Sequence, residues 1–114
     1  MHKDFITPDG LSELGKAATE TILKCGSRYL EGEISGGGCK AFYSPDEWEK
    51  RGEQYGKGCE LIVCHDGGDL APFFSNDYEC YSLMEKMADA LNEHKLYAEQ
   101  CTGWYTAIYK CAIF

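Results

Sequence analysis

The sequence predicts a single α+β domain, in which two or three helices pack against a mainly antiparallel sheet of three or four strands. Two stretches carry apolar residues at helical spacing, and short apolar or alternating runs lie between and after them. A chain of 114 residues is also large enough for one hydrophobic core but not for two. Residues 1–114 are therefore expected to form one domain.

The first helix is predicted to begin at Thr7 and Pro8, because threonine caps helices well and proline suits the first helical position. Gly32 is expected to end it. The apolar face of this helix comprises Leu11, Leu14, Ala18, Ile22, Cys25 and Tyr29. The glycine-rich residues 35–38 then fit a turn. They lack the Lys-Ser/Thr of a phosphate-binding loop.

The middle of the chain predicts a strand, a short helix and a second strand. Residues 39–43 form the first strand. Ser44, Pro45 and Glu47 then match a capping box, and the helix that they start is expected to end near Gly56. Its packing side is expected to carry Trp48, Arg51, Gly52 and Tyr55. Residues 60–65 contain a continuous Leu-Ile-Val run, which indicates a central strand buried on both faces.

The last third predicts a helix followed by a hairpin. Asn76 and Glu79 suggest a second capping box, and the helix after it carries an apolar face. Residues 96–101 and 104–109 read as two strands joined by a two-residue turn, with Cys101 opposite Trp104. This register places the following residues on one face: Tyr97, Glu99, Cys101, Trp104, Thr106 and Ile108.

The net charge of −8 is concentrated in the middle of the chain, where residues 41–80 carry nine acidic and three basic side chains. Such a surface repels phosphate, so direct binding of nucleic acid is not expected. It attracts a basic partner instead. The alternative is a solvated surface that only aids solubility.

The seven cysteines are odd in number and irregularly spaced, and the N-terminus lacks the apolar core of a signal peptide. No stretch is long enough to span a membrane. We therefore expect reduced thiols in a cytoplasmic protein that does not bind membranes. An alternative is a zinc site at Cys59, Cys64, His65 and Cys80, but its spacing is unlike that of common zinc sites. No metal or cofactor is predicted.

Cys64, His65 and Asp66 are the residues that suggest catalysis, as a nucleophile with its base. Neighbours on a strand point to opposite faces, however, so their adjacency does not make a dyad. Asp66 could alternatively share a divalent cation with Asp69 and Asp77, although the spacing fails the EF-hand pattern. The simpler interpretation is that Asp66 and the glycines after it form a turn.

Binding through charged and aromatic side chains is the leading hypothesis. Phe73 and Phe74 follow a proline in a glycine-rich loop, so one could anchor the loop while the other contacts a partner. In the alternative, both pin the loop to the sheet. The candidate charged residues are Asp46, Glu47, Glu49, Glu53, Asp66 and Asp69, and the candidate anchors are Tyr55, Phe73 and Phe74.

Residues 59–74, 97–101 and 103–109 together resemble small open reading frames of bacterial phages and prophages. Compact acidic phage proteins of this size often resemble inhibitors of host defence such as the anti-CRISPR proteins. The resemblance implies a non-enzymatic inhibitor in the cytoplasm of an infected bacterium, which occupies a basic nucleic-acid-binding surface or a subunit interface of a host protein or ribonucleoprotein complex. Two alternatives stay open: a small enzyme or ligand-binding protein using Cys64, His65 and Asp66, and a homodimer.

Overall fold

The structure is a computed structural model and describes residues 3–111. Its helices are α1 (Glu13–Leu30), α2 (Pro45–Arg51), α3 (Ala71–Phe74) and α4 (Tyr81–Asn92), with 3-10 turns η1 (Lys3–Phe5) and η2 (Asn76–Tyr78). Its strands are β1 (Phe42–Tyr43), β2 (Leu61–Cys64), β3 (Leu96–Gln100) and β4 (Tyr105–Lys110). The predicted α+β class is confirmed. The fourth helix is α3, a single turn that forms where we expected a loop.

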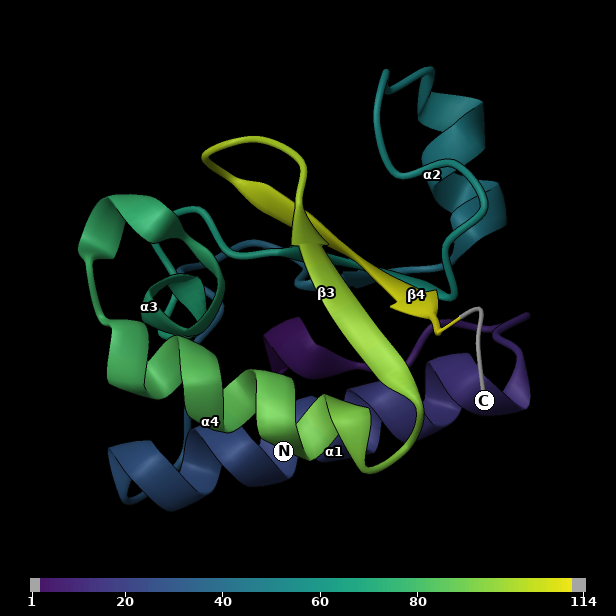
Figure 1. The fold of residues 1–114 in the computed structure, drawn as a ribbon. Coiled ribbons are helices and arrows are strands. Elements are labelled where there is room, and N and C mark those ends of the chain that lie inside the picture. Colours follow the sequence, from purple (N-terminus) through teal and green to yellow (C-terminus); the bar gives the residue numbers. More distant parts are fainter. Residues whose placement is uncertain (1–2, 112–114) are drawn as a thin grey trace.

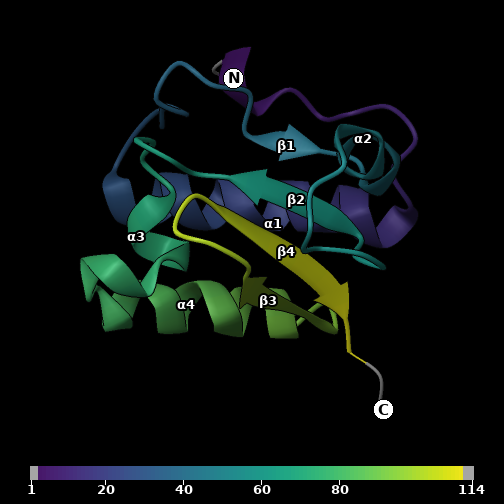
Figure 2. The same ribbon diagram turned by 90° about the horizontal axis from the view of Figure 1, so that it is seen from above.

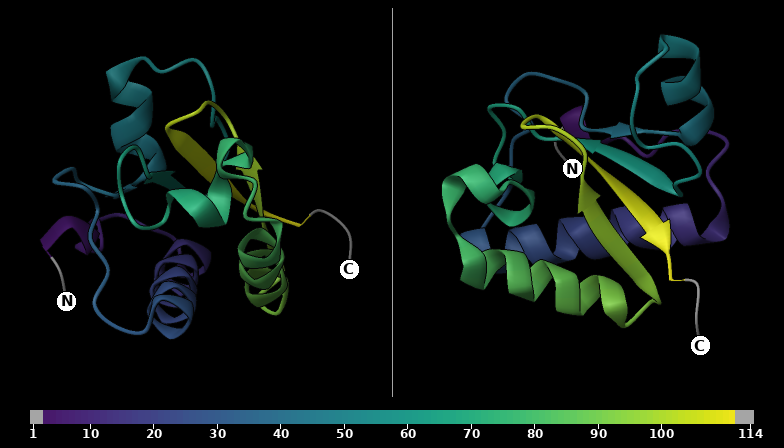
Figure 3. Two further views of the ribbon diagram at one scale, coloured as in Figure 1. Left: turned by 90° about the vertical axis from the view of Figure 1, so that its left-hand side faces the viewer. Right: turned by 45° about the horizontal axis from the view of Figure 1, so that its top comes forward.

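The four strands form one antiparallel sheet in the order β1-β2-β4-β3. Helices α1 and α4 lie side by side against one face of the sheet, and α2 lies toward the other (Figures 1 and 2). Each face has its own apolar cluster. The larger cluster joins α1, α3 and α4 to the sheet, and the smaller one surrounds Trp48 of α2. Figure 3 shows these layers from two further sides.

Strand β2 occupies the centre of the sheet, as its apolar run predicts. All four of its residues are buried, and it pairs with β1 on one side and β4 on the other. Ile62 and Cys64 belong to the cluster around Trp48, whereas Leu61 and Val63 belong to the larger cluster. The strand thus separates the two clusters, because its successive side chains alternate between faces.

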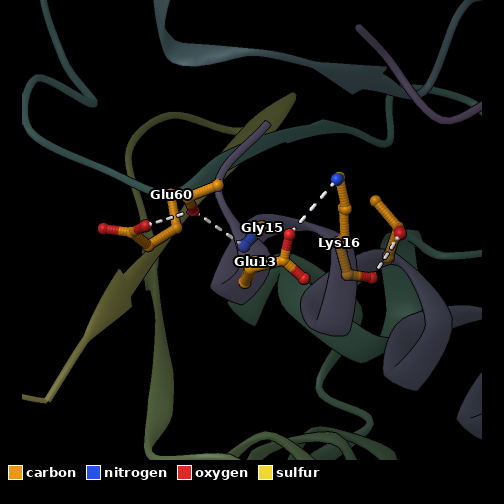
Figure 4. Close-up of polar contacts among 6 residues, drawn as sticks. Glu13, Gly15, Lys16 and Glu60 are labelled. Atoms are coloured by element: carbon orange, nitrogen blue, oxygen red, sulfur yellow. Dashed lines mark hydrogen bonds and ion pairs between the residues drawn. The ribbon is translucent and has the colours of Figure 1, made fainter. Parts of the chain in front are cut away.

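Helix α1 begins five residues later than predicted, at Glu13. Gly10 adopts the left-handed φ of 79° and interrupts a helical path from Pro8. Ser12 is the cap instead: its hydroxyl accepts from the Gly15 amide at 3.0 Å and donates to Glu60 Oε1 at 2.6 Å (Figure 4). These bonds attach the start of α1 to the residue before β2, and Glu13 pairs with Lys16 beside them at 3.4 Å.

The capping box of α2 is confirmed, but its end is not. The helix stops at Arg51, because Gly52 takes the left-handed conformation and its amide donates to Glu49 O. The second predicted capping box is wrong. Asn76 lies in η2, which Ser75 caps, and α4 starts after Cys80 without any side-chain cap. The first strand is also shorter than predicted, since only Phe42 and Tyr43 pair.

The hairpin between β3 and β4 differs from the predicted register by one residue. Gln100 lies opposite Thr106, and the Cys101 amide donates to Tyr105 O at 3.1 Å. The turn is therefore wider than two residues, and the Thr102 hydroxyl accepts from the Trp104 amide within it at 3.2 Å. A one-residue shift changes every cross-strand partner. Tyr97 consequently stacks on Tyr109 at 5.5 Å rather than pairing with Ile108.

Candidate functional site

Helix α2 is held on the sheet by a cluster of aromatic rings around Trp48, whose side chain is 3% exposed. The centroid of the Trp48 ring lies 4.8 Å from that of Tyr105, 5.0 Å from Tyr43 and 5.8 Å from Trp104. These tilted and edge-to-face arrangements are the ones that aromatic pairs favour. The Arg51 guanidinium lies over Trp48 at 4.8 Å. A seven-residue helix is thereby fixed in place, together with the charged residues on its outer side.

The first turn of α2 uses one of the candidate carboxylates internally. Glu47 Oε1 accepts from the Ser44 amide at 3.1 Å, and Glu47 Oε2 pairs with Lys40 Nζ at 2.7 Å. Partial burial alone would raise the pKa of Glu47, but the Lys40 ammonium and the Ser44 bonds lower it below its ordinary value. Glu47 therefore serves the helix cap, and its charge is already compensated.

Asp46 and Glu49 are different, because both are exposed on the outer side of α2. Within residues 3–111, neither carboxylate makes a hydrogen bond or an ion pair. The loop after the helix adds Glu53, which lies 3.4 Å from Arg51, and Tyr55, which is 48% exposed. Glu49, Glu53 and Tyr55 line one hollow of about 290 Å³ whose inner wall is Trp48. We call Asp46, Glu49, Glu53 and Tyr55 the α2 surface.

The Tyr105 hydroxyl positions the loop that carries Tyr55. It donates to Tyr55 O and accepts from the Tyr55 amide, both at 3.3 Å. Burial raises the pKa of Tyr105, although its backbone bond to Tyr55 acts in the other direction. Gly56 follows with a φ of 97°, and a Cβ there would lie 2.7 Å from Ile62 Cδ1. The loop is thus packed against the sheet while the Tyr55 ring stays exposed.

Asp66 and Asp69 lie apart from the α2 surface. Because β1 and β2 are antiparallel, α2 starts beside the first residues of β2, whereas Asp66 follows its last residue. Asp69 is also engaged: its carboxylate accepts from the Ser35 amide and its own amide donates to Ser35 O, both at 2.8 Å. The six predicted carboxylates therefore do not form one surface.

The expectation of an exposed phenylalanine anchor is wrong. Phe73 and Phe74 are 2% and 3% exposed and belong to the larger cluster. Pro72 lies in the first turn of α3, and this turn directs both rings inward. The Phe74 ring stacks on His65 at 5.9 Å. The alternative, in which both rings pin the loop to the sheet, describes the structure.

Cys64, His65 and Asp66 do not converge on one site. Cys64 lies in the cluster around Trp48, where burial raises its pKa to about 12. His65 faces the other side, where its Nε2 bonds to Thr106 Oγ1 at 3.0 Å and burial lowers its pKa to about 4. Asp66 is exposed beyond the strand. A thiol that stays protonated and an imidazole of low basicity, on opposite faces of a sheet, do not act together as nucleophile and base.

All seven cysteines are free thiols, and Cys25, Cys59 and Cys64 are buried. Among residues 3–111, no three His, Cys, Asp or Glu side chains are grouped so that they could hold a metal ion. None of the helices in this range is both long and apolar enough to span a bilayer. Compared with protein-family models, curated proteins and solved structures, the chain matches none of them.

Sequence reasoning found the residues of the α2 surface but missed what supports them. The prediction that Trp48 lies on the packing side is confirmed, but it is wrong for Arg51, Gly52 and Tyr55, which are exposed. The ring cluster depends on Tyr43, Trp104 and Tyr105, which come from β1 and from the end of the hairpin. The sequence shows that aromatic residues lie beside the start of α2 and beside the hairpin turn. It does not show which of these rings contact one another.

Proposed function

We propose that the protein is a non-enzymatic, phage-encoded inhibitor of a bacterial defence complex, similar in action to anti-CRISPR proteins. In this proposal the α2 surface occupies a basic surface that the complex otherwise uses to bind nucleic acid or another subunit. The observation that supports it best is the arrangement of Asp46, Glu49, Glu53 and Tyr55. The exposed Glu49 and Tyr55 and the half-buried Glu53 line one hollow, which Lys57 also lines, and Asp46 is exposed on the same helix as Glu49. The Trp48 ring of that helix packs against three other aromatic rings.

In this proposal the carboxylates and the Tyr55 ring make different contributions to binding. Asp46 and Glu49, which make no ion pair within residues 3–111, accelerate encounter with a basic groove and favour partners of opposite charge, whereas Glu53 is already paired with Arg51. Tyr55 offers a large apolar area with a hydroxyl at its end, which is the composition of interface anchors. Because the Tyr105 hydroxyl bonds to the Tyr55 amide and carbonyl, little backbone freedom of Tyr55 remains to be lost when the partner binds.

The proposal is tested with purified CRISPR effector complexes, one a single-protein nuclease and one a multisubunit complex. The protein is expected to displace labelled target DNA from at least one of them, and less effectively as salt is added. Reversing charge with Asp46→Lys plus Glu49→Lys should weaken displacement at least about tenfold, which corresponds to about 1.4 kcal/mol. Displacement is read by fluorescence anisotropy of the DNA.

The matched control is Glu20→Lys plus Glu33→Lys, which changes the net charge equally at exposed positions outside the α2 surface. This control should displace DNA almost as well as the unaltered protein. If the two double variants lose displacement equally, overall charge rather than the α2 surface is responsible. Failure of the unaltered protein to bind either complex at low ionic strength contradicts the proposed function.

A further inference from the structure

A groove of about 400 Å³ runs between helix α4 and strand β3. Its deep wall is apolar and consists of Phe73, Phe74 and Met87, while Met84 and the small residues Ala88 and Ala98 lie nearer the surface. Glu85 is the one charged residue among those that line it. Unbranched methionine side chains adapt to differently shaped apolar groups. The groove can therefore accept apolar side chains of more than one shape.

Strand β3 forms one wall of this groove and is also an edge of the sheet. The Cys101 amide donates to Tyr105 O, and the Cys111 amide donates to Lys95 O. Bonded and non-bonded pairs alternate along an antiparallel ladder. Tyr97 and Glu99 therefore bond to β4, whereas the amides and carbonyls of Leu96, Ala98 and Gln100 point away from the sheet.

Nothing in the described part of the chain pairs with these outward backbone groups of β3. The strand contains no proline and no lysine. Tyr97, Ala98 and Glu99 are exposed, and Glu99 is its one charged residue. The Tyr97 ring is 41% exposed and stacks on Tyr109. An unpaired edge beside an apolar groove offers the two things that an added strand needs, which are backbone partners and pockets for alternate side chains.

One end of the groove is closed by a polar contact. Gln100 Oε1 accepts from the Asn76 amide at 3.0 Å and from Asn76 Nδ2 at 3.1 Å, so the end of β3 is attached to η2. The Gln100 amide group also donates to Thr102 O at 3.1 Å. Phe73 and Phe74 lie in α3, directly before η2. This contact fixes the relative positions of the strand, the phenylalanines and the closed end.

We propose that this groove binds an extended peptide segment of a partner protein, which adds to β3 as a fifth, antiparallel or parallel strand. Its alternate side chains are apolar and enter the groove toward Met84, Met87 and the two phenylalanines. A lysine or arginine of the segment pairs with Glu85, because the groove offers one negative charge and no positive one. Its backbone bonds to Leu96, Ala98 and Gln100.

A single extended segment suits this site better than the edge of a second copy of the chain. Helix α4 is joined to β3 by only three residues and packs directly beside it (Figures 1 and 2). A second copy that paired through β3 would bring its own α4 to the same side of the joined sheets, next to the first. A lone peptide fills the groove without a second helix. The site belongs to β3 and not to α2, so it does not depend on the proposed function.

The test selects ligands from random peptides displayed on filamentous phage, with the intact protein as bait. Enriched peptides should carry apolar residues at alternate positions and a lysine or arginine. Ala88→Trp, which places a ring in the groove from an exposed position, should reduce their affinity at least about tenfold. Glu85→Lys should weaken binding, whereas the matched change Glu20→Lys on the exposed side of α1 should not.

Amide hydrogen exchange supplies a readout specific to strand addition. On binding a selected peptide, the amides of Leu96, Ala98 and Gln100 should exchange more slowly, while those of Tyr97 and Glu99, already bonded to β4, should change little. Light scattering with each peptide should show one protein copy per complex. No enrichment beyond that obtained with the Ala88→Trp protein overturns the proposal. Enriched peptides that leave the three outward amides unprotected, or that bring two copies together, overturn it as well.

Discussion

Acidification from pH 7 to pH 5 should lower the free energy of unfolding by about 2 kcal/mol through His65 alone. Burial lowers the pKa of His65 to about 4 from an ordinary value of 6.5. Between these values the unfolded chain binds a proton at His65 and the folded protein does not. Stability from this residue is therefore complete above pH 6.5 and is lost as the pH falls toward 4.

The structural reason is the position of the ring, which is 1% exposed. Its Nε2 bonds to Thr106 Oγ1, and the Phe74 ring stacks on it. Within the described residues Nδ1 is buried with no hydrogen-bond partner. A second proton on the ring would thus place a charge among apolar side chains without compensation. Among residues 3–111, the Asp66 carboxylate is the one charge that raises the pKa of His65.

Urea denaturation followed by tryptophan fluorescence measures the effect. His65→Gln keeps a side chain that can bond to Thr106 but removes the titrating group. Between pH 7 and pH 5 the free energy of unfolding of this variant should therefore fall by about 2 kcal/mol less than that of the unaltered protein. The control is His94→Gln, at an exposed position, which should retain the full loss seen in the unaltered protein. Equal losses in the unaltered and His65→Gln proteins would refute the assignment of a buried, neutral imidazole.

Two further predictions concern the thiols and the cap of α2. Iodoacetamide should modify the exposed Cys39 in the native protein. Cys59 and Cys64 should react only after unfolding, because burial raises their pKa values to about 11 and about 12. Peptide mass spectrometry would identify the modified cysteines. Native modification of Cys64 would be inconsistent with its place in the core. Glu47→Ala should lower the free energy of unfolding by about 1 kcal/mol, because it removes the capping box and the ion pair with Lys40. Asp46→Ala should change it very little. Equal melting temperatures of the two variants would argue against this difference.

Features that depend on neighbouring residues were the most predictable. The capping box at Ser44 and Glu47 needs only four consecutive residues, and the buried strand β2 shows in one apolar run. The start of α1 was missed because two signals compete within six residues. Thr7 and Pro8 are good starting residues, but Gly10 breaks the helix between them and Ser12.

The hairpin register could not be predicted from the turn residues, because tertiary contacts of Tyr105 determine it. Tyr105 supplies a ring to Trp48 and a hydroxyl to the Tyr55 backbone. Those contacts come from residues about fifty positions away, and they require Tyr105 to lie opposite Cys64 on β2. A two-residue turn would place the side chains of β3 one position out of step with it.

The sequence by itself determined the α+β class, the central buried strand and the excess of acidic residues in the middle of the chain. Only the tertiary structure decided which of those residues act together. It separated Asp66 and Asp69 from α2 and buried Phe73 and Phe74. It also placed Cys64 in the cluster around Trp48 and His65 against Phe74, on the other face of the sheet. The physical reason is that strand pairing and helix packing bring together residues distant in the chain, whereas local patterns record only the preferences of neighbours.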